Sequence, residues 1–237
     1  DITVLQPGKN LGWEGGIKLG LENTTAPFVC LLNDDTYIPP SSQLWLNTLL
    51  KHFNDPTVGA VGPASNVVMG LQNIFTFVPY HVFERKFLIG FCFLVRREAI
   101  EKVGGIDDTC PAADDFDMSI RIRKAGYRLL VDRTAFVYHH GMKTGNRLLG
   151  DAAQRNGWNS FEHMEKGNHF IIKKHGFKAW AEVMKDSYTL PEMPEGQKWE
   201  DTEGKLIREA IGDPKGLKIL DLGCGNNKTL PEATGLD

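Results

Sequence analysis

The chain has 237 residues, of which 41% are hydrophobic and 24% charged, and its formal net charge is −3. This composition is typical of a soluble globular protein and gives no general electrostatic reason to bind nucleic acid. No apolar run reaches the roughly 20 residues that a membrane-spanning helix needs, and no signal peptide is recognisable. We therefore expect a cytoplasmic protein whose four cysteines, none of them in a C-x-x-C pair, are reduced thiols.

Short apolar runs alternate with helical spacings along the first part of the chain. Trp13, Ile17 and Leu21 are spaced as on one face of a helix, and residues 27–32 form a continuous apolar run of strand length. In chain order, we predict strands at residues 2–5, 27–32, 58–61, 87–95, 127–131 and 135–138, and helices at residues 12–23, 41–53, 97–103 and 116–125. Ser41 or Ser42 is the expected cap of the second helix. The alternation predicts an α/β sheet with helical crossovers.

The last part of the chain has a different pattern. Residues 151–185 show an amphipathic helical spacing, and residues 188–204 combine proline, glycine and many charges, which indicates a linker. A further strand is predicted at residues 217–222, and glycines follow it directly.

Two adjacent carboxylates follow the apolar run at residues 27–32. Asn33, Asp34 and Asp35 would lie at the carboxyl end of a strand, which is where open parallel sheets bind ligands. Neighbouring carboxylates repel unless a positive charge lies beside them, and Mg²⁺ or Mn²⁺ favours oxygen ligands that it often shares with substrate phosphates. The alternative is a turn, because Asn-Asp-Asp-Thr is also good turn and helix-cap chemistry.

A second acidic cluster and a pair of histidines follow other predicted elements. Residues 114–117 read Asp-Asp-Phe-Asp at a helix start, where the helix dipole stabilises carboxylates and where a carboxylate could instead serve as a general base. His139 and His140 follow the predicted strand at residues 135–138, so they are either metal ligands or ordinary loop residues. Taken together, the three features favour a ligand site at the strand ends.

Four stretches between residues 10 and 141 resemble, in order and spacing, the family-2 nucleotide-sugar glycosyltransferases, and most closely their rhamnosyltransferase-like bacterial branch. They are Asn10-x-Gly12 with Gly16-x-Lys18-x-Gly20; residues 31–36, which match a DXD-type motif; residues 90–97 with Gly104-Gly105-Ile-Asp107; and Asp114-Asp115-Phe-Asp117 with Arg121 and Ala125-Gly126-Tyr127. Lys18 stands where the family usually has asparagine. The resemblance implies a GT-A, Rossmann-like fold with a mixed, mainly parallel sheet flanked by helices.

The resemblance also implies roles for individual residues. Asp115 falls on the position of the family's catalytic base and Asp35 on that of its metal ligand, and His139 (or His140 in its place) approaches the metal. The donor-side residues are Asn10, Gly12, Lys18, Asn33 and Asp34, and the acceptor-side residues are Asp114, Asn66 and Gln72. The implied ligands are a nucleotide-sugar donor, a glycan or other hydroxyl acceptor, and Mn²⁺ or Mg²⁺.

The implied activity is inverting glycosyl transfer, of EC class 2.4, in bacterial cell-surface polysaccharide or glycan synthesis. Asp115 would deprotonate the acceptor hydroxyl as it attacks the anomeric carbon, and the metal on Asp35 would stabilise the departing diphosphate. An acceptor at the inner face of the membrane is compatible with a cytoplasmic enzyme. Two other interpretations stay open: a non-catalytic module that binds a glycan or sugar nucleotide, and a protein whose main activity belongs to a second domain. The sequence leaves the donor sugar, the acceptor and the oligomeric state open.

The two ends of the chain lead to expectations about domain organisation. The family's first βαβα unit is missing from the sequence. Residues 217–237 resemble motif I of the Rossmann-like S-adenosylmethionine methyltransferases, through Asp221, Gly223, Gly225 and Asp237. We expect a glycosyltransferase domain at residues 1–150, its helical extension at 151–187, a linker or helix at 188–214 and the truncated start of a methyltransferase domain at 215–237. We expect S-adenosylmethionine to bind only to an intact full-length protein.

Overall fold

The structure is a computed structural model that describes residues 2–76, 78, 81–141, 160–188, 213, 218, 220–222 and 234–236. The chain divides into two compact units, Asp1–Pro191 and Glu192–Asp237. Parts of three predictions lie outside the described residues: the beginning of the helical region at 151–185, most of the linker at 188–204, and the glycines after the strand at 217–222. No helix in the described part of the chain is long and apolar enough to cross a membrane.

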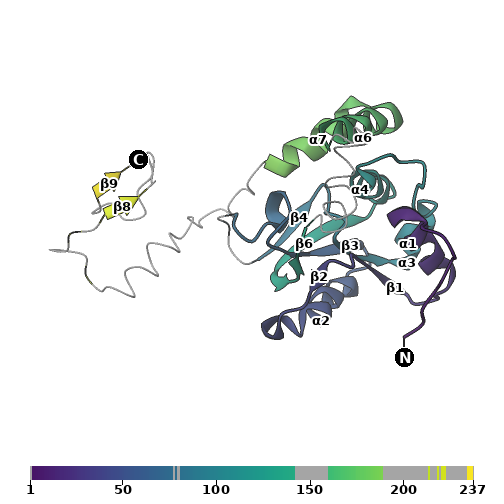
Figure 1. The fold of residues 1–237 in the computed structure, drawn as a ribbon, viewed down its shortest axis with the longest axis horizontal. Helices are drawn as coiled ribbons and strands as arrows, with labels where there is room; N and C mark the ends of the chain where they lie inside the picture. Colours follow the sequence, from purple (N-terminus) through teal and green to yellow (C-terminus); the bar gives the residue numbers. More distant parts are fainter. Residues whose placement is uncertain are drawn as a thin grey trace. The chain divides into compact units, whose positions relative to one another are not determined.

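Five strands form the main sheet of the first unit (Figure 1). In spatial order they are β1 (Phe28–Leu32), β5 (Cys92–Arg96), β3 (Val58–Ala64), β6 (Arg128–Phe136) and β4 (Val82–Arg85). β3 and β6 pair in parallel, whereas the pairs β1–β5, β5–β3 and β6–β4 are antiparallel. The predicted mixed α/β sheet is therefore confirmed. β1, β3 and β6 run in one direction, and the antiparallel β5 is inserted between β1 and β3.

Helices cover both faces of this sheet. On one face lie α1 (Gly12–Glu22), α3 (Arg97–Lys102) and α4 (Asp114–Lys124), and on the other lies α2 (Trp45–Leu50) (Figure 1). The predicted helices at residues 12–23, 97–103 and 116–125 are thus confirmed, with α4 beginning two residues early. Left-handed glycines follow α3 and α4, as the predicted helix ends require: Gly104 has a φ of +84° and Gly126 a φ of +94°.

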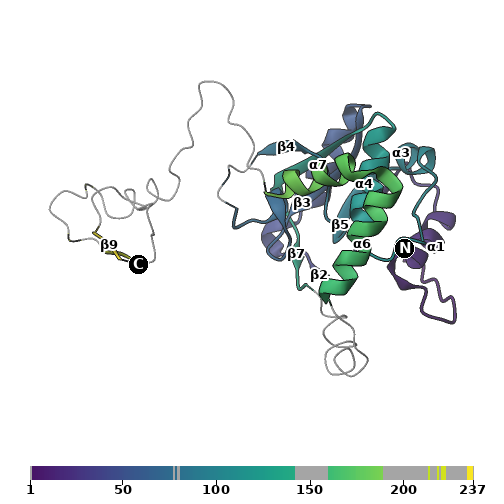
Figure 2. The same ribbon diagram turned by 90° about the horizontal axis from the view of Figure 1, so that it is seen from above.

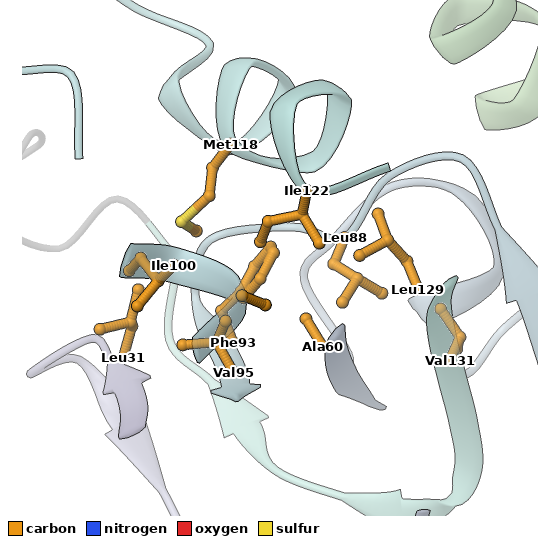
Figure 3. Packing of buried hydrophobic residues seen from close by; sticks show 11 residues of the cluster. Leu31, Ala60, Leu88, Phe93, Val95, Ile100, Met118, Ile122, Leu129 and Val131 are labelled. Carbon is orange, nitrogen blue, oxygen red and sulfur yellow. The ribbon is translucent and has the colours of Figure 1, made fainter. Parts of the chain in front are cut away.

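Successive strand residues point to opposite faces of the sheet, and two hydrophobic cores follow this alternation. Phe93 and Val95 of β5 pack with Met118 and Ile122 of α4, whereas Leu94 between them packs on the side of α2. Figure 3 shows the first core, in which Met118 and Ile122 point from α4 toward the strands. Burial on both faces explains why the sequence shows continuous apolar runs at its strands.

A hairpin of two helices, α6 (Ser160–His175) and α7 (Phe177–Tyr188), lies beside α4 (Figures 1 and 2). The helical region expected here is interrupted at Gly176, whose φ of +88° is left-handed. Ile171 of α6 is fully buried in one cluster with Phe116 of α4. The hairpin therefore packs against the helix that begins with the predicted base.

A second, two-stranded sheet is formed by the short strands that follow β1 and β6 in the chain. It consists of β2 (Thr36–Tyr37) paired with β7 (Tyr138–His139). The remaining elements of the first unit are the 3-10 turns η1 (Pro40–Ser42), η2 (Lys51–Asn54) and η3 (Gly70–Gln72). In the second unit, β8 (Leu220–Leu222) pairs in parallel with β9 (Thr234–Leu236), so the strand predicted at 217–222 is confirmed at its C-terminal end.

Three local signals gave wrong predictions because tertiary pairing decided otherwise. Residues 2–5 are irregular and exposed, with Ile2 94% exposed, since no described strand pairs with this β-branched run. Gly62-Pro63 does not end β3, which continues to Ala64 in parallel pairing with β6. Ser41 lies in a 3-10 turn rather than capping α2, whose start has no side-chain cap.

Strand boundaries were also wrong in the second half of the sheet. β5 begins only at Cys92, so residues 87–91 approach the site as irregular backbone. The two strands predicted at 127–131 and 135–138 form one long strand, β6, followed by the short β7. β4 was not predicted because its sequence, Val-Phe-Glu-Arg, carries two charges. Such charges are tolerated at the edge position that β4 occupies.

Candidate functional site

The candidate site lies where β1 ends and the approach to β5 begins. The backbone N–H of Asn33 donates to the carbonyl of Phe91 at 2.9 Å, which extends the β1–β5 ladder by one step. This bond places Asn33, Asp34 and Asp35 next to Gly90 and Phe91. Asp34 is exposed, whereas the side chain of Asp35 is only 12% exposed.

Asp35 faces His139, as the resemblance implied. The β2–β7 pairing sets Thr36 opposite His139, and the N–H of His140 donates to the carbonyl of Asp35 at 2.8 Å. These backbone bonds bring His139 Nε2 to 3.1 Å from Asp35 Oδ1. The imidazole also stacks on the ring of Phe91, with 5.3 Å between the centroids.

The surroundings of His139 fix which ring nitrogen carries the proton. Nδ1 lies 2.9 Å from the carbonyl of Val67, which can only accept, so Nδ1 donates. In the neutral ring, the Nε2 lone pair then faces Asp35 Oδ1, and two acceptors at 3.1 Å repel. Asp35 Oδ1 is moreover buried and receives no hydrogen bond from any residue that the structure describes. A proton on Nε2 or a cation between the two atoms is needed.

The pair suits a divalent cation. Two ligands about 2.1 Å from one ion and at right angles lie about 3.0 Å apart, close to the separation observed here. A histidine whose other nitrogen donates to a backbone carbonyl is the usual arrangement of a metal ligand. No cluster of three or more His, Cys, Asp and Glu side chains that could hold a metal occurs among the described residues. Asp35 and His139 would supply two ligands, and phosphate oxygens and water could occupy other positions around the ion.

The second half of the site is the start of α4. Asp115 Oδ2 accepts the N–H of Gly90 at 3.2 Å, and its Oδ1 accepts the N–H of Phe116 at 2.9 Å. Burial raises the pKa of Asp115 to about 6, although these N–H groups oppose the rise. Burial and the neighbouring charge of Asp115 raise the pKa of Asp114 to about 7, and Glu14 adds to the repulsion. A carboxylate with a pKa near 6 is suited to general-base catalysis at neutral pH.

The third acid of this cluster has the opposite environment. Asp117 is 1% exposed and pairs with Arg121, Lys174 and His175, each at 2.7 Å. Burial alone would raise the pKa of Asp117, but these partners hold it below the ordinary value. Arg121 also donates to the carbonyls of Val103 and Gly105. Asp117 and Arg121 of the motif therefore have structural roles.

Trp13 joins the two halves of the site. Its indole N–H donates to Asn33 Oδ1 at 3.0 Å, and its ring lies 3.5 Å from the position that a Cβ on Gly90 would occupy. The same Cβ would lie 3.5 Å from Cβ of Asp115. Gly90 thus lies against Asp115, and its neighbour Phe91 contacts Asn33 and His139. Residues 90–91 therefore connect Asp115 with the Asp35–His139 pair. Sequence reasoning missed Trp13 and Phe91, although both lie inside the quoted motifs.

The other predicted site residues fall into two groups. Asn10 accepts the N–H of Gly12 at 2.9 Å before α1, and Lys18 pairs with Asp108 at 3.1 Å on the surface, so no described contact joins them to Asp35 or Asp115. Asn66 accepts the backbone N–H of His139 at 2.9 Å and so supports the metal side.

Gln72 is 2% exposed and its amide is used inside the protein. It donates to the carbonyl of Pro63 and accepts the N–H of Ile89, which holds the segment leading to Gly90. Of the predicted S-adenosylmethionine motif, Asp221 lies in β8, whereas Gly223, Gly225 and Asp237 lie outside the described residues.

Comparison with known proteins finds relatives in Mycobacterium tuberculosis. No protein-family model matches the chain. It is 27% identical over 197 residues to an uncharacterised protein of Mycobacterium tuberculosis, a match that covers 77% of this chain and 72% of the relative. It is 30% identical over 154 residues to a pre-mycofactocin glycosyltransferase of the same organism, which covers 59% of this chain and 32% of that enzyme. Over these 154 residues the chain is similar to a glycosyltransferase, as the sequence motifs implied.

Among solved structures, a mannosyltransferase from Pyrobaculum calidifontis in complex with GDP-Man and Mn²⁺ aligns with a TM-score of 0.47 and 15% identity. The alignment covers 90% of this chain and 64% of that one. The family-2 branch, the inverting mechanism and the methyltransferase fusion stay predictions.

Proposed function

We propose that the first unit is a family-2, inverting, metal-dependent glycosyltransferase domain, which moves a sugar from a nucleotide-diphosphate donor to a hydroxyl acceptor. One observation carries the proposal. Residues 90–91 connect a carboxylate of raised pKa, Asp115, to the largely buried Asp35–His139 pair, in which Asp35 Oδ1 receives no hydrogen bond from any described residue. The sequence similarity to a glycosyltransferase supports the same chemistry.

Asp115 is the proposed general base. Its two oxygens accept backbone N–H groups from Gly90 and Phe116, and these bonds fix its orientation without protonating it. Above a pH of about 6 it is ionised and can take the proton of an acceptor hydroxyl as that oxygen attacks the anomeric carbon. Attack from the side opposite the departing diphosphate inverts the anomeric configuration.

Asp35 and His139 are the proposed metal ligands for Mn²⁺ or Mg²⁺. Val67 and Asn66 hold His139 in place, and the β2–β7 pairing holds Asp35 opposite it. A divalent cation bound there would neutralise the charge that develops on the leaving diphosphate. Asn33, whose side chain is held by Trp13, lies beside this pair on the proposed donor side.

The central experiment compares Asp115→Asn with the wild type in a sugar-transfer assay with a panel of nucleotide sugars and Mn²⁺. Loss of a general base lowers the turnover number by roughly 10²–10⁴-fold, and the similar size of asparagine leaves donor binding intact. Asp108→Asn, at the surface pair with Lys18, is the matched control and should keep full activity.

Proton NMR of the product reports whether the anomeric configuration is inverted. Retained turnover of Asp115→Asn would exclude Asp115 as the base. Donor binding without turnover in every variant, wild type included, would instead identify a non-catalytic sugar-nucleotide-binding module.

For the second unit we propose the beginning of an S-adenosylmethionine-binding domain. β8 and β9 pair in parallel, and Asp237 directly follows β9, as the motif requires of its ribose-binding acid. Calorimetric titration of S-adenosylmethionine into a polypeptide that carries the complete second domain tests this. Binding should be lost in Gly223→Val, since a side chain there blocks the approach of the cofactor.

A further inference from the structure

One backbone outlier lies directly before the proposed base. Among the described residues, Ala113 is the only non-glycine with a positive φ, at 63°, and it caps α4 just ahead of Asp114 and Asp115. The left-handed region is unfavourable for alanine, because its Cβ crowds the following carbonyl oxygen. Such a conformation persists only where the surrounding structure imposes it. The question is which element imposes it here.

Helix α6 lies in close contact with this turn. A Cβ on Gly167 of α6 would lie 2.9 Å from both Cβ and the carbonyl oxygen of Ala112, and 3.0 Å from its carbonyl carbon. Two of these three atoms belong to the backbone, so rotation of a side chain could not relieve the clash. The helix backbone at Gly167 therefore lies directly against the residue before Ala113.

The last turn of α6 contacts both ends of the segment at residues 107–117, which contains Ala113. Lys174 Nζ pairs with Asp107 and, at 2.7 Å, with Asp117, so one ammonium group joins two carboxylates on either side of Ala113. His175 Nε2 adds a contact of 2.7 Å to Asp117. Because Asp117 is 1% exposed, these contacts are poorly screened by water.

We propose that α6 positions the catalytic base, with Gly167 and Lys174 as its positioning residues. Because Gly167 has no side chain, the backbone of α6 can pack directly against the Ala112–Ala113 turn. Lys174 pairs with both Asp107 and Asp117 and so links the two ends of the segment that contains this turn. The left-handed Ala113 then aims the first turn of α4, and with it Asp115, at Gly90. This inference rests on the proposed role of Asp115 as the base.

The magnitude of the effect follows from the geometry of proton transfer. A general base must reach the proton it takes at about 2.6–3.2 Å, and a displacement of about 1 Å can cost roughly 10²-fold in rate. A methyl group at residue 167 would have to move from 2.9 Å to an ordinary contact beyond about 3.4 Å, which shifts α6 and the turn apart. The expected loss is therefore about 10-fold or more in the turnover number.

The experiment measures sugar transfer by Gly167→Ala, Lys174→Met and Lys174→Arg. Gly167→Ala and Lys174→Met should each lower kcat about 10-fold or more, with the KM for the donor within about twofold of the wild type. The acid limb of the kcat–pH profile should also shift, because the surroundings of Asp115 change. Lys174→Arg keeps the positive charge and should recover most of the activity.

Lys173→Met, which changes the neighbouring exposed lysine of α6, is the matched control and should behave as the wild type. A merely structural role predicts a lower unfolding midpoint with an unchanged kcat and pH profile in the folded fraction, and that result would overturn the inference. If Gly167→Ala does not fold, the two Lys174 variants decide the outcome alone. Asp115→Asn, assayed in parallel, separates the two proposals. If it stays active, the proposed function fails; if it is inactive while the α6 variants keep their kcat, only the positioning role fails.

Discussion

The two acidic clusters of the first unit are built from similar residues and have different surroundings. At Asp34 and Asp35, the turn after β1 separates the two carboxylates, so that one is exposed and the other faces His139 in a nearly buried contact. At residues 114–117, three carboxylates share one helical turn. In the first cluster Asp35 Oδ1 receives no hydrogen bond from any described residue, whereas in the second cluster Asp117 is paired with Arg121 and Lys174.

Within the second cluster, the pKa values of Asp115 and Asp117 are shifted in opposite directions. Asp115 is half-buried and Asp117 is buried on α4, but only Asp117 is surrounded by Arg121, Lys174 and His175, and its pKa is lowered. Asp115 is held by backbone N–H groups alone, and burial raises its pKa to about 6. The comparison teaches that the role of an acid depends on its partners in space, and the following variants test it.

The largest effect on stability is expected at Asp117. Asp117→Ala leaves two cationic side chains, Arg121 and Lys174, without their buried partner, and removal of one partner from a buried charge network typically costs about 3–5 kcal/mol in the free energy of unfolding. Urea denaturation followed by circular dichroism measures this change. Asp108→Ala, at an exposed pair, should stay within about 0.5 kcal/mol of the wild type. Equal effects of the two variants would show that the network around Asp117 has no special stabilising role.

A smaller effect, on metal binding, should separate the two residues of the first cluster. Asp35→Ala removes the carboxylate that faces His139 and should weaken Mn²⁺ binding by about 10–100-fold, with a parallel fall in transfer activity. Asp34→Ala removes the exposed neighbour and should leave the Mn²⁺ affinity within about threefold of the wild type. Isothermal titration with Mn²⁺ gives both values. The metal assignment fails if Asp34→Ala loses more affinity than Asp35→Ala.

The smallest effect is a pH dependence of stability at Asp114. The folded protein raises the pKa of Asp114 to about 7, above the ordinary value of 3.8, so the folded state binds more protons and loses stability as the pH rises from about 4 to about 7. Asp114→Asn should therefore raise the free energy of unfolding by about 1 kcal/mol at pH 7.5 and change it little at pH 4. Urea titrations at both pH values check this. Stabilisation at pH 4 alone would contradict the sign.

The raised pKa of Asp115 predicts a pH profile for catalysis. Since Asp115 must be ionised to accept a proton, kcat should rise as the pH increases through about 6. The charge of Asp115 helps to raise the pKa of the adjacent Asp114 to about 7. In Asp114→Asn the limb should stay at about the same pH, because Asp114, with a pKa of about 7, is mostly protonated where Asp115 titrates.

Much of the scaffold could be predicted because local signals and tertiary packing agree there. The helical spacing of Trp13, Ile17 and Leu21 matches α1, whose Ile17 and Leu21 pack on the sheet, and the glycines after α3 and α4 adopt the left-handed conformation that ends a helix. The candidate site residues Asp35, Asp115 and His139 were found through motifs of fixed spacing, and the structure joins them through residues 90–91.

By itself, the sequence determined the α/β class, most helices, and the identity of the acids and histidine that could carry chemistry. Only the tertiary structure decided which acid has a raised pKa and which is paired with cationic side chains, that β5 runs antiparallel to its neighbours, and that α6 lies against the turn before Asp115. The physical reason is that hydrophobic periodicity and turn propensity act over a few residues. Desolvation, ion pairing and strand direction, by contrast, depend on groups such as Lys174 that lie dozens of positions away along the chain.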